Sequence, residues 1–277
     1  MSCLLLLSSM LVVVHLRSGM NEFGLQLSGA RDSFWRLSII SELLNHFPPQ
    51  LPGFAGVPLK NYHFYYDFFV ATIEQLTGIS SIFLYLHYIS VFSAILFVIG
   101  VYSLLVLLVK NKFMALYGTV FTILTGNLSY ILPFLSNQYN FVVRSNIFMS
   151  DQPFDQGHNP FNLLSYALVI GGVYIFVQWE KSGRFRWVML MGLISSILPG
   201  VKIYAAIILF VIYGIGFLIN MIQKRHILWE SCLPFITMIP SLLFIKGSGF
   251  AILAFTPGWW LTKMIEDHDR LFLQGMN

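Results

Sequence analysis

Few side chains in this 277-residue chain can do acid–base or ligand chemistry, because it holds only 12 Asp and Glu and 7 His. Two pairs of charged or titratable side chains have the spacing of one helical turn, Asp32 with Arg36 and His63 with Asp67. Asp32 could deprotonate an acceptor hydroxyl or steady a sugar that leaves a lipid phosphate. His63 and Asp67 could ligate a metal ion at this spacing, or could form the solvated face of a surface helix.

A third group lies in the segment SDQPFDQGHNPFN, residues 150–162. Asp151, Asp155 and His158 are close together in it. This acidic cluster could supply a second catalytic base or a divalent-cation site, or could be an ordinary polar loop. We expect no obligate cofactor, and a divalent cation is the one candidate.

Lys202 lies in the otherwise apolar stretch VKIYAAIILF, residues 201–210. An ionisable group at membrane depth is by default a functional-site candidate. The alternative is that Lys202 extends to the outer interface and keeps its charge in water. The sequence holds no Gly-rich phosphate loop, H-E-x-x-H motif or G-x-S-x-G elbow, so chemistry with a soluble nucleotide has no visible site.

The composition indicates that membrane spans position these residues. Hydrophobic residues make up 57% of the chain and charged residues 10%, against about 25% charged residues in soluble domains. With 26 Phe and 13 Tyr, this much apolar surface must face lipid. Cytosolic enzymes, nucleic-acid-binding modules and disulfide-stapled secreted domains are excluded, and Cys3 and Cys232 are interpreted as small hydrophobic side chains.

A transmembrane helix needs about 20 mostly apolar residues. Such runs cover about 1–16, 81–109, 114–134, 162–178, 201–222 and 229–246, and a shorter run covers 187–198. We interpret the first run as a span and not as a signal peptide, because no basic segment precedes it and no small-residue cleavage site follows it.

Basic residues accumulate in cytoplasmic loops, and here seven Lys and Arg lie in three short connections. The loops at about 110–113, 179–186 and 223–228 are therefore predicted to be cytoplasmic, and those at 17–80 and 135–161 to face outward. The net charge of +4 follows this sidedness and implies no nucleic-acid partner.

The last two cytoplasmic loops lie on one side, so the chain between them crosses the membrane twice or not at all. We interpret it as crossing twice, with its turn at Pro199–Gly200. The helix 187–198 rises only about 18 Å, which predicts a turn about 10 Å below the outer surface, in a water-filled cavity. The expected architecture is an all-α, polytopic protein with about seven transmembrane helices in one domain, 1–277, in the plasma membrane of a bacterium or archaeon.

The long first outer loop shows helical periodicity. Phe34, Leu37, Ile40, Leu44 and Phe47 recur on one face of an amphipathic interfacial helix over 32–47. As an alternative to a catalytic role, Asp32 could be the N-cap of this helix and pair with Arg36 one turn further on. A proline-rich stretch and a second amphipathic helix over about 62–76 follow.

The run ARDSFWRLSIISELLNHFPPQLPGFAGVPLKNYHFYYDFFVA, residues 30–71, resembles the first outer loop of the glycosyltransferase C superfamily, the relatives of protein mannosyltransferases and oligosaccharyltransferases. Those proteins have an acidic residue after the first span, an interfacial helix, a proline-rich turn and a tyrosine-rich tract. The resemblance covers about 40 residues well and the order of spans in 1–246 loosely.

The resemblance implies a seven-span module that takes sugars from polyprenyl-phosphate carriers at the outer face. It places the catalytic carboxylate at Asp32 and a second acidic motif at Asp151 and Asp155, and it suits Lys202 to the donor phosphate. Arg36, His63, Asp67 and His158 are the further candidates for substrate binding. A single Asp after Arg31 differs from the Asp-Asp or Asp-Glu pairs of metal-dependent members, and members are usually longer, so we expect an N-terminal fragment.

The sequence therefore favours an inverting glycosyltransferase that binds membrane lipid and a lipid-linked sugar. Two alternatives stay open. One is a lipid-linked oligosaccharide flippase or small-solute transporter, with a midplane site at Pro199–Gly200 and Lys202. The other is a scaffold without activity of its own, and neither protein partners nor oligomeric state can be predicted.

Overall fold

The computed structural model describes residues 2–16, 19–21, 24–26, 30–54, 56–60, 62–124, 160–224 and 229–246. The acidic cluster of Asp151, Asp155 and His158 lies outside the described residues, as do residues 125–134 of the predicted third span. The described part is mostly helical, with an irregular segment between α2 and α3 and one short hairpin that the sequence did not predict. In it β1 (Gly19–Asn21) pairs antiparallel with β2 (Gly24–Gln26).

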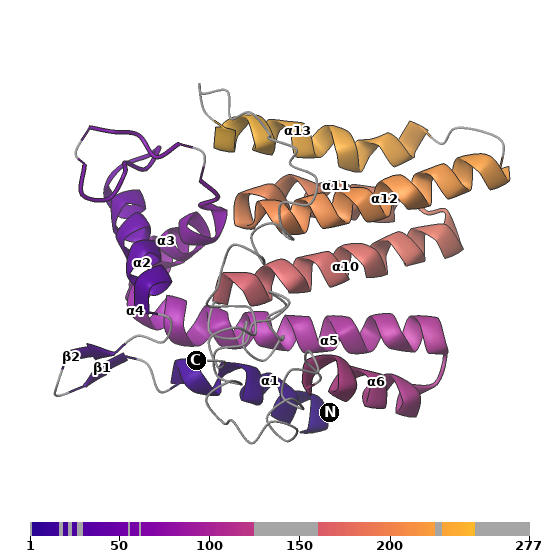
Figure 1. The fold of residues 1–277 in the computed structure, drawn as a ribbon, viewed down its shortest axis with the longest axis horizontal. Helices are drawn as coiled ribbons and strands as arrows, with labels where there is room; N and C mark the ends of the chain where they lie inside the picture. The colour runs from indigo at the N-terminus through magenta and orange to yellow at the C-terminus, as the bar shows by residue number, and fades with distance from the viewer. Residues whose placement is uncertain are drawn as a thin grey trace, which may run out of the picture.

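Apolar helices lie side by side and form the body of the molecule (Figure 1). They are α1 (Ser2–Leu16), α5 (Ile89–Val109), α6 (Lys112–Leu124), α10 (Pro160–Ser182), α11 (Phe185–Val201), α12 (Ile203–Lys224) and α13 (Leu233–Lys246). The short α4 (Ser81–Phe83) and the π-helical η1 (Leu84–Tyr88) lead into α5, and the 3-10 turn η3 (Trp229–Cys232) precedes α13. Over the described residues, these elements confirm that the predicted apolar runs are helices.

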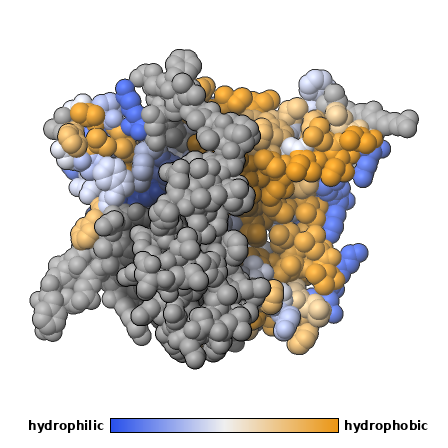
Figure 2. Space-filling view, viewed as in Figure 1, coloured by the Kyte–Doolittle hydropathy of each residue, from blue (hydrophilic) through white to orange (hydrophobic). Residues whose placement is uncertain are grey.

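Three segments of the described chain are long and apolar enough to cross a membrane, namely Ser81–Val109, Phe161–Ser182 and Ile203–Gln223. Large apolar side chains remain exposed on the bundle, among them Ile222 at 72% and Leu243 at 63%. Figure 2 shows a broad hydrophobic face over the bundle. A soluble monomer rarely exposes such a surface, so the predicted membrane class is supported.

The breaks between helices match the predicted connections at two places and differ at a third. Lys110 and Asn111 separate α5 from α6, and Gly183 and Arg184 separate α10 from α11. The turn predicted at Pro199–Gly200 is wrong, because α11 continues through both residues and the chain breaks at Lys202. The helix therefore has 17 residues and rises about 25 Å. A turn about 10 Å below the outer surface, which the shorter run implied, is not needed.

The connection between α1 and α4 holds the two predicted amphipathic helices, α2 (Ala30–Asn45) and α3 (Tyr65–Thr77). They lie at the end of the bundle where α5 and α10 begin (Figure 1). The predicted apolar face of α2 is only partly right, because Phe34 and Phe47 are exposed whereas Ile40 is buried. The buried face includes Arg36 instead, which is 2% exposed.

Candidate functional site

A buried ion pair joins α2 to α3. A nitrogen of the Arg36 guanidinium, Nη1, lies 2.6 Å from Oδ2 of Asp67, and the two side chains are 2% and 0% exposed. The same nitrogen donates to the carbonyl of His63 at 3.0 Å. This partner of Arg36 lies 31 residues further along the chain, and the predicted pairing of Arg36 with Asp32 involves a side chain outside the described residues.

Burial and charge set the protonation states of this pair. Burial raises the pKa of Asp67 to about 6, although the adjacent guanidinium opposes the rise, so the carboxylate is ionised at neutral pH. Burial alone would lower the pKa of Arg36, but the Asp67 carboxylate together with Tyr62 and Tyr85 outweighs burial, and the pKa is raised. The pair is therefore a charged unit whose net charge is close to zero.

His63 is held as a neutral ring beside this pair. Its Nε2 lies 2.9 Å from Nη2 of Arg36, and a guanidinium can only donate, so Nε2 is the acceptor and Nδ1 carries the proton. Burial, Arg36 and Lys202 lower the pKa of His63 to about 4. The ring also stacks on Tyr62 at 4.8 Å between centroids. His63 thus offers one N–H donor at neutral pH and no charge.

The predicted metal pair and the predicted solvated face are both wrong for His63 and Asp67. Arg36 contacts both side chains, so a guanidinium occupies the place that a metal ion would take. Asp67 is fully buried and presents no solvated face. No group of three or more His, Cys, Asp or Glu among the described residues is arranged to hold a metal ion.

Lys202, which lies between α11 and α12, also reaches the site formed by Arg36, His63 and Asp67. Its Nζ donates a hydrogen bond to Oδ1 of Asn162 in the first turn of α10. It also lies 5.1 Å from the centre of the Phe161 ring, and the guanidinium carbon of Arg36 lies 4.1 Å from that centre. Two cations from separate elements therefore meet at one aromatic ring, where each gains from the ring's negative face.

Two buried polar atoms under this cluster have no hydrogen-bond partner in the part of the chain that the structure describes. They are Oδ1 of Asp67 and the hydroxyl of Tyr66, and both residues are 0% exposed. Burial raises the pKa of Tyr66, so its hydroxyl is a neutral donor. An internal water molecule could accept from this hydroxyl or donate to this carboxylate oxygen.

The other predicted site residues have different outcomes. Asp32 is the third residue of α2, and not its N-cap as predicted, one turn before Arg36 in the same helix. The structure thus brings Arg36, His63, Asp67 and Lys202 into one cluster. Asp151, Asp155 and His158 lie outside the described residues, so their relation to this cluster stays a prediction.

Sequence reasoning did not include Phe161 and Asn162 in the site. The signal available was Pro160, which suits the first position of a helix and does begin α10. Polar and aromatic side chains in the first turn of an apolar helix must lie near its end.

No family model, curated protein or solved structure matches this chain.

Proposed function

We propose that this protein is a multi-pass membrane glycosyltransferase that moves a sugar from a polyprenyl-phosphate carrier to an acceptor on the extracytoplasmic face. The observation that carries the proposal is the meeting of Arg36 and Lys202 at the ring of Phe161, at the end of the bundle beside α2 and α3. A cationic aromatic site at a bundle end suits an anionic headgroup whose lipid chain stays in the membrane.

Lys202 and His63 are the groups of this site that would bind a phosphate. Asp67 neutralises Arg36, and the ammonium of Lys202 donates to the amide oxygen of Asn162. A phosphate bound there would pair with the ammonium and could accept the Nδ1–H of His63. Arg36 then acts mainly by holding His63 in its neutral form, and Asp67 acts by holding Arg36.

The reaction assigned to the site is an inverting displacement. Asp32 takes the proton of the acceptor hydroxyl while its oxygen forms a bond to the anomeric carbon, and the bond from that carbon to the carrier phosphate breaks. The electron pair leaves on the phosphate, which Lys202 stabilises without a strong acid. Asp151 or Asp155 would assist as a second carboxylate.

The membrane arrangement belongs to the same proposal. Seven spans would be formed by α1, α5, α6 and α10–α13, with α2 and α3 on the outer surface of a plasma membrane. A transporter with Lys202 at the membrane midplane receives less support, because Lys202 contacts the second and third residues of α10, Phe161 and Asn162. The start of a spanning helix lies near the membrane surface.

The test is transfer of radiolabelled sugar from polyprenyl phosphate in membranes that contain the protein. We expect transfer by the wild type and at least a hundredfold less by Asp32→Asn, the usual effect of losing a general base. Glu42→Gln in the same helix removes the same charge and should keep full transfer. Full transfer activity in Asp32→Asn would show that Asp32 is not the general base. No transfer by the wild type over a panel of sugars would favour a carrier or a scaffold.

A further inference from the structure

The bundle end opposite α2 and α3 gathers basic side chains from two breaks in the chain. Residues 107–114 contain the break between α5 and α6, and residues 179–187 contain the break between α10 and α11. These two stretches hold five basic residues and one acidic residue, Glu180. The five, which are all exposed and which we call the basic patch, are Lys110, Lys112, Lys181, Arg184 and Arg186.

Packing of α5 on α10 sets the two breaks side by side. The ammonium of Lys181 donates a hydrogen bond to the carbonyl of Leu107 in the last turn of α5, at 3.0 Å. A helix end leaves its last four carbonyls without an internal partner, so this contact also satisfies the end of α5. The five cations therefore belong to one place on the surface, and Figure 2 shows hydrophilic side chains at this end of the bundle.

The basic patch lies where two long apolar segments end. Ser81–Val109 and Phe161–Ser182 are both long and apolar enough to cross a membrane, and each ends beside residues of the patch. The end of a spanning helix lies at the level of the lipid headgroups. The cations are therefore placed where the phosphate groups of a bilayer lie.

Exposed apolar side chains alternate with the cations. Val109 and Phe113 flank the two lysines of the first break and are 48% and 75% exposed, and Phe185, beside Arg186, is 54% exposed. The guanidinium carbon of Arg186 lies 4.9 Å from the centre of the Trp187 ring. A phospholipid suits both kinds of side chain, because its phosphate pairs with the cations while its acyl chains cover the apolar groups. A soluble polyanion would match the cations alone.

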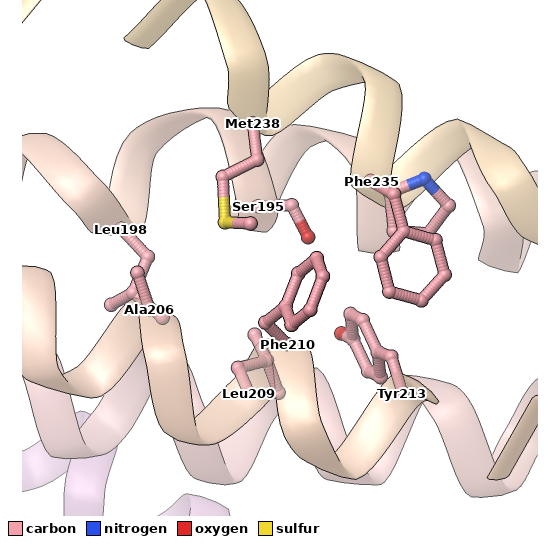
Figure 3. A pocket seen from close by; sticks show the side chains of 9 residues that line it. Ser195, Leu198, Ala206, Leu209, Phe210, Tyr213, Phe235 and Met238 are labelled. Carbon is pink, nitrogen blue, oxygen red and sulfur yellow. The ribbon is translucent and has the colours of Figure 1, made fainter. Parts of the chain in front are cut away.

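The cavity drawn in Figure 3 offers no competing place for such a headgroup. It lies between α11, α12 and α13 and has a volume of about 10 Å³. This volume has room for one water molecule. The polar residues of its lining are Ser195 and Tyr213, which carry hydroxyl groups and no cation. Of these two places, only the basic patch can pair with a phosphate.

We propose that the basic patch binds the phosphate headgroup of an anionic phospholipid in the leaflet at this end of the bundle. Arg184 and Arg186 can each give a phosphate two parallel N–H bonds, whereas the lysines act as point charges. The positive-inside rule assigns this leaflet to the cytoplasm, where anionic lipids attract basic segments. The proposal does not depend on the proposed function, because the candidate site for sugar transfer lies at the opposite end.

Native mass spectrometry of the purified protein measures this binding directly. The protein in detergent micelles would be mixed with equal amounts of phosphatidylglycerol, which is anionic, and phosphatidylcholine, which is zwitterionic. We expect the first lipid adduct to be phosphatidylglycerol, with a preference that falls as the ammonium acetate concentration rises, since salt screens exposed charges. Equal binding of the two lipids would overturn the proposal.

Single variants locate the binding site. Arg184→Gln should lower the preference for phosphatidylglycerol about fivefold, the change expected for one basic residue at an anionic lipid surface. Arg184→Lys keeps the charge and should keep most of the preference. Lys60→Gln removes one charge from an exposed residue between α2 and α3, at the opposite end, and should leave the preference unchanged. An equal loss in Arg184→Gln and Lys60→Gln would show attraction to the net charge of the chain and contradict the patch.

A soluble headgroup tests whether a lipid is the partner. Glycerophosphoglycerol is the headgroup of phosphatidylglycerol without its acyl chains. At the concentration of the phospholipid it should not displace the lipid adduct, because it has no chains to cover Phe113 and Phe185. Displacement would show that the patch takes a soluble phosphate, and the lipid proposal would then be wrong.

Discussion

At the scale of single residues, the Arg36–Asp67 pair governs the candidate site. Both side chains are removed from water, and removing charges from water costs several kcal/mol per ion unless they are paired. The pair therefore adds little net stability. Its effect is to fix the guanidinium, which in turn fixes the tautomer of His63.

Removing one member of the pair should destabilise the protein strongly. Asp67→Ala leaves the Arg36 charge buried without its counter-ion, and we expect a loss of about 3–5 kcal/mol in the free energy of unfolding. Denaturant titration in mixed micelles measures this loss. The double variant Arg36→Met with Asp67→Leu should recover most of it, and a double variant as unstable as Asp67→Ala alone would contradict the burial argument.

The protonation of His63 makes the stability depend on pH. The unfolded chain binds a proton at His63 near its ordinary pKa of 6.5, whereas the folded protein binds it only near 4. Between these values the unfolded state holds more protons, so the free energy of unfolding falls as the pH falls.

The reference protein is His63→Gln. Both it and the wild type contain Asp67, so the pH dependence that Asp67 contributes to the free energy of unfolding cancels in the comparison. Relative to this variant, the wild type should lose on the order of 2 kcal/mol between pH 7 and pH 4. Thermal unfolding in detergent across this range measures the difference. Parallel pH profiles of the two proteins would show that His63 is not held neutral.

At the scale of elements, the position of α3 depends on a close contact with α11. A Cβ placed on Gly200 would lie 2.1 Å from the ring of Tyr65. Tyr65 also hydrogen-bonds Ser241 in α13 at 3.5 Å, so its ring lies where α3, α11 and α13 meet. The Pro199–Gly200 pair, which predicted a turn, instead provides the space into which α3 docks.

A methyl group at Gly200 should therefore displace α3. We expect Gly200→Ala to lower the free energy of unfolding by about 1–3 kcal/mol, as overpacking usually does. Gly214→Ala in α12 is the matched control, because nothing lies within 4 Å of its Cβ position, and it should cause no loss. Tyr65→Leu should restore the free energy of unfolding that Gly200→Ala removes. If it does not, the loss does not arise from the contact between residue 200 and the ring of Tyr65.

At the scale of the whole molecule, the two ends of the bundle differ in chemistry. Basic residues lie in and beside the breaks after α5 and α10, namely Lys110, Lys112, Lys181, Arg184 and Arg186. Figure 2 shows hydrophilic side chains at the bundle end opposite α2 and α3. The positive-inside rule assigns that end to the cytoplasm. The candidate site would then face outward.

Single cysteines report this orientation in cells. In a background with Cys3→Ser and Cys232→Ser, Gln75→Cys at the α3 end should react with a membrane-impermeant thiol reagent on intact cells. Asn111→Cys, at the break between α5 and α6, should react only after the membrane is opened. Reaction of both before opening, or the reverse order, would invalidate the proposed sidedness.

Local patterns in the sequence determined the helical class, the apolar helices and the two amphipathic helices of the outer loop. Each of these depends on residues within a few turns of one another, where hydrophobic periodicity and the length needed to cross lipid are decisive. The predicted ends of α2 and α3 lie within three residues of those in the structure.

Only the tertiary structure decided how the site residues are paired. The helical spacing predicted that His63 and Asp67 act together, and packing of α2 on α3 places the guanidinium of Arg36 against both of them. Lys202 finds Asn162, 40 residues away in sequence, because α10 and α12 begin at the same end of the bundle. Spacing fixes the helix face on which a side chain lies, whereas the partner of a buried charge depends on which helices pack together, and the most favourable counter-ion is the one that packing brings within reach.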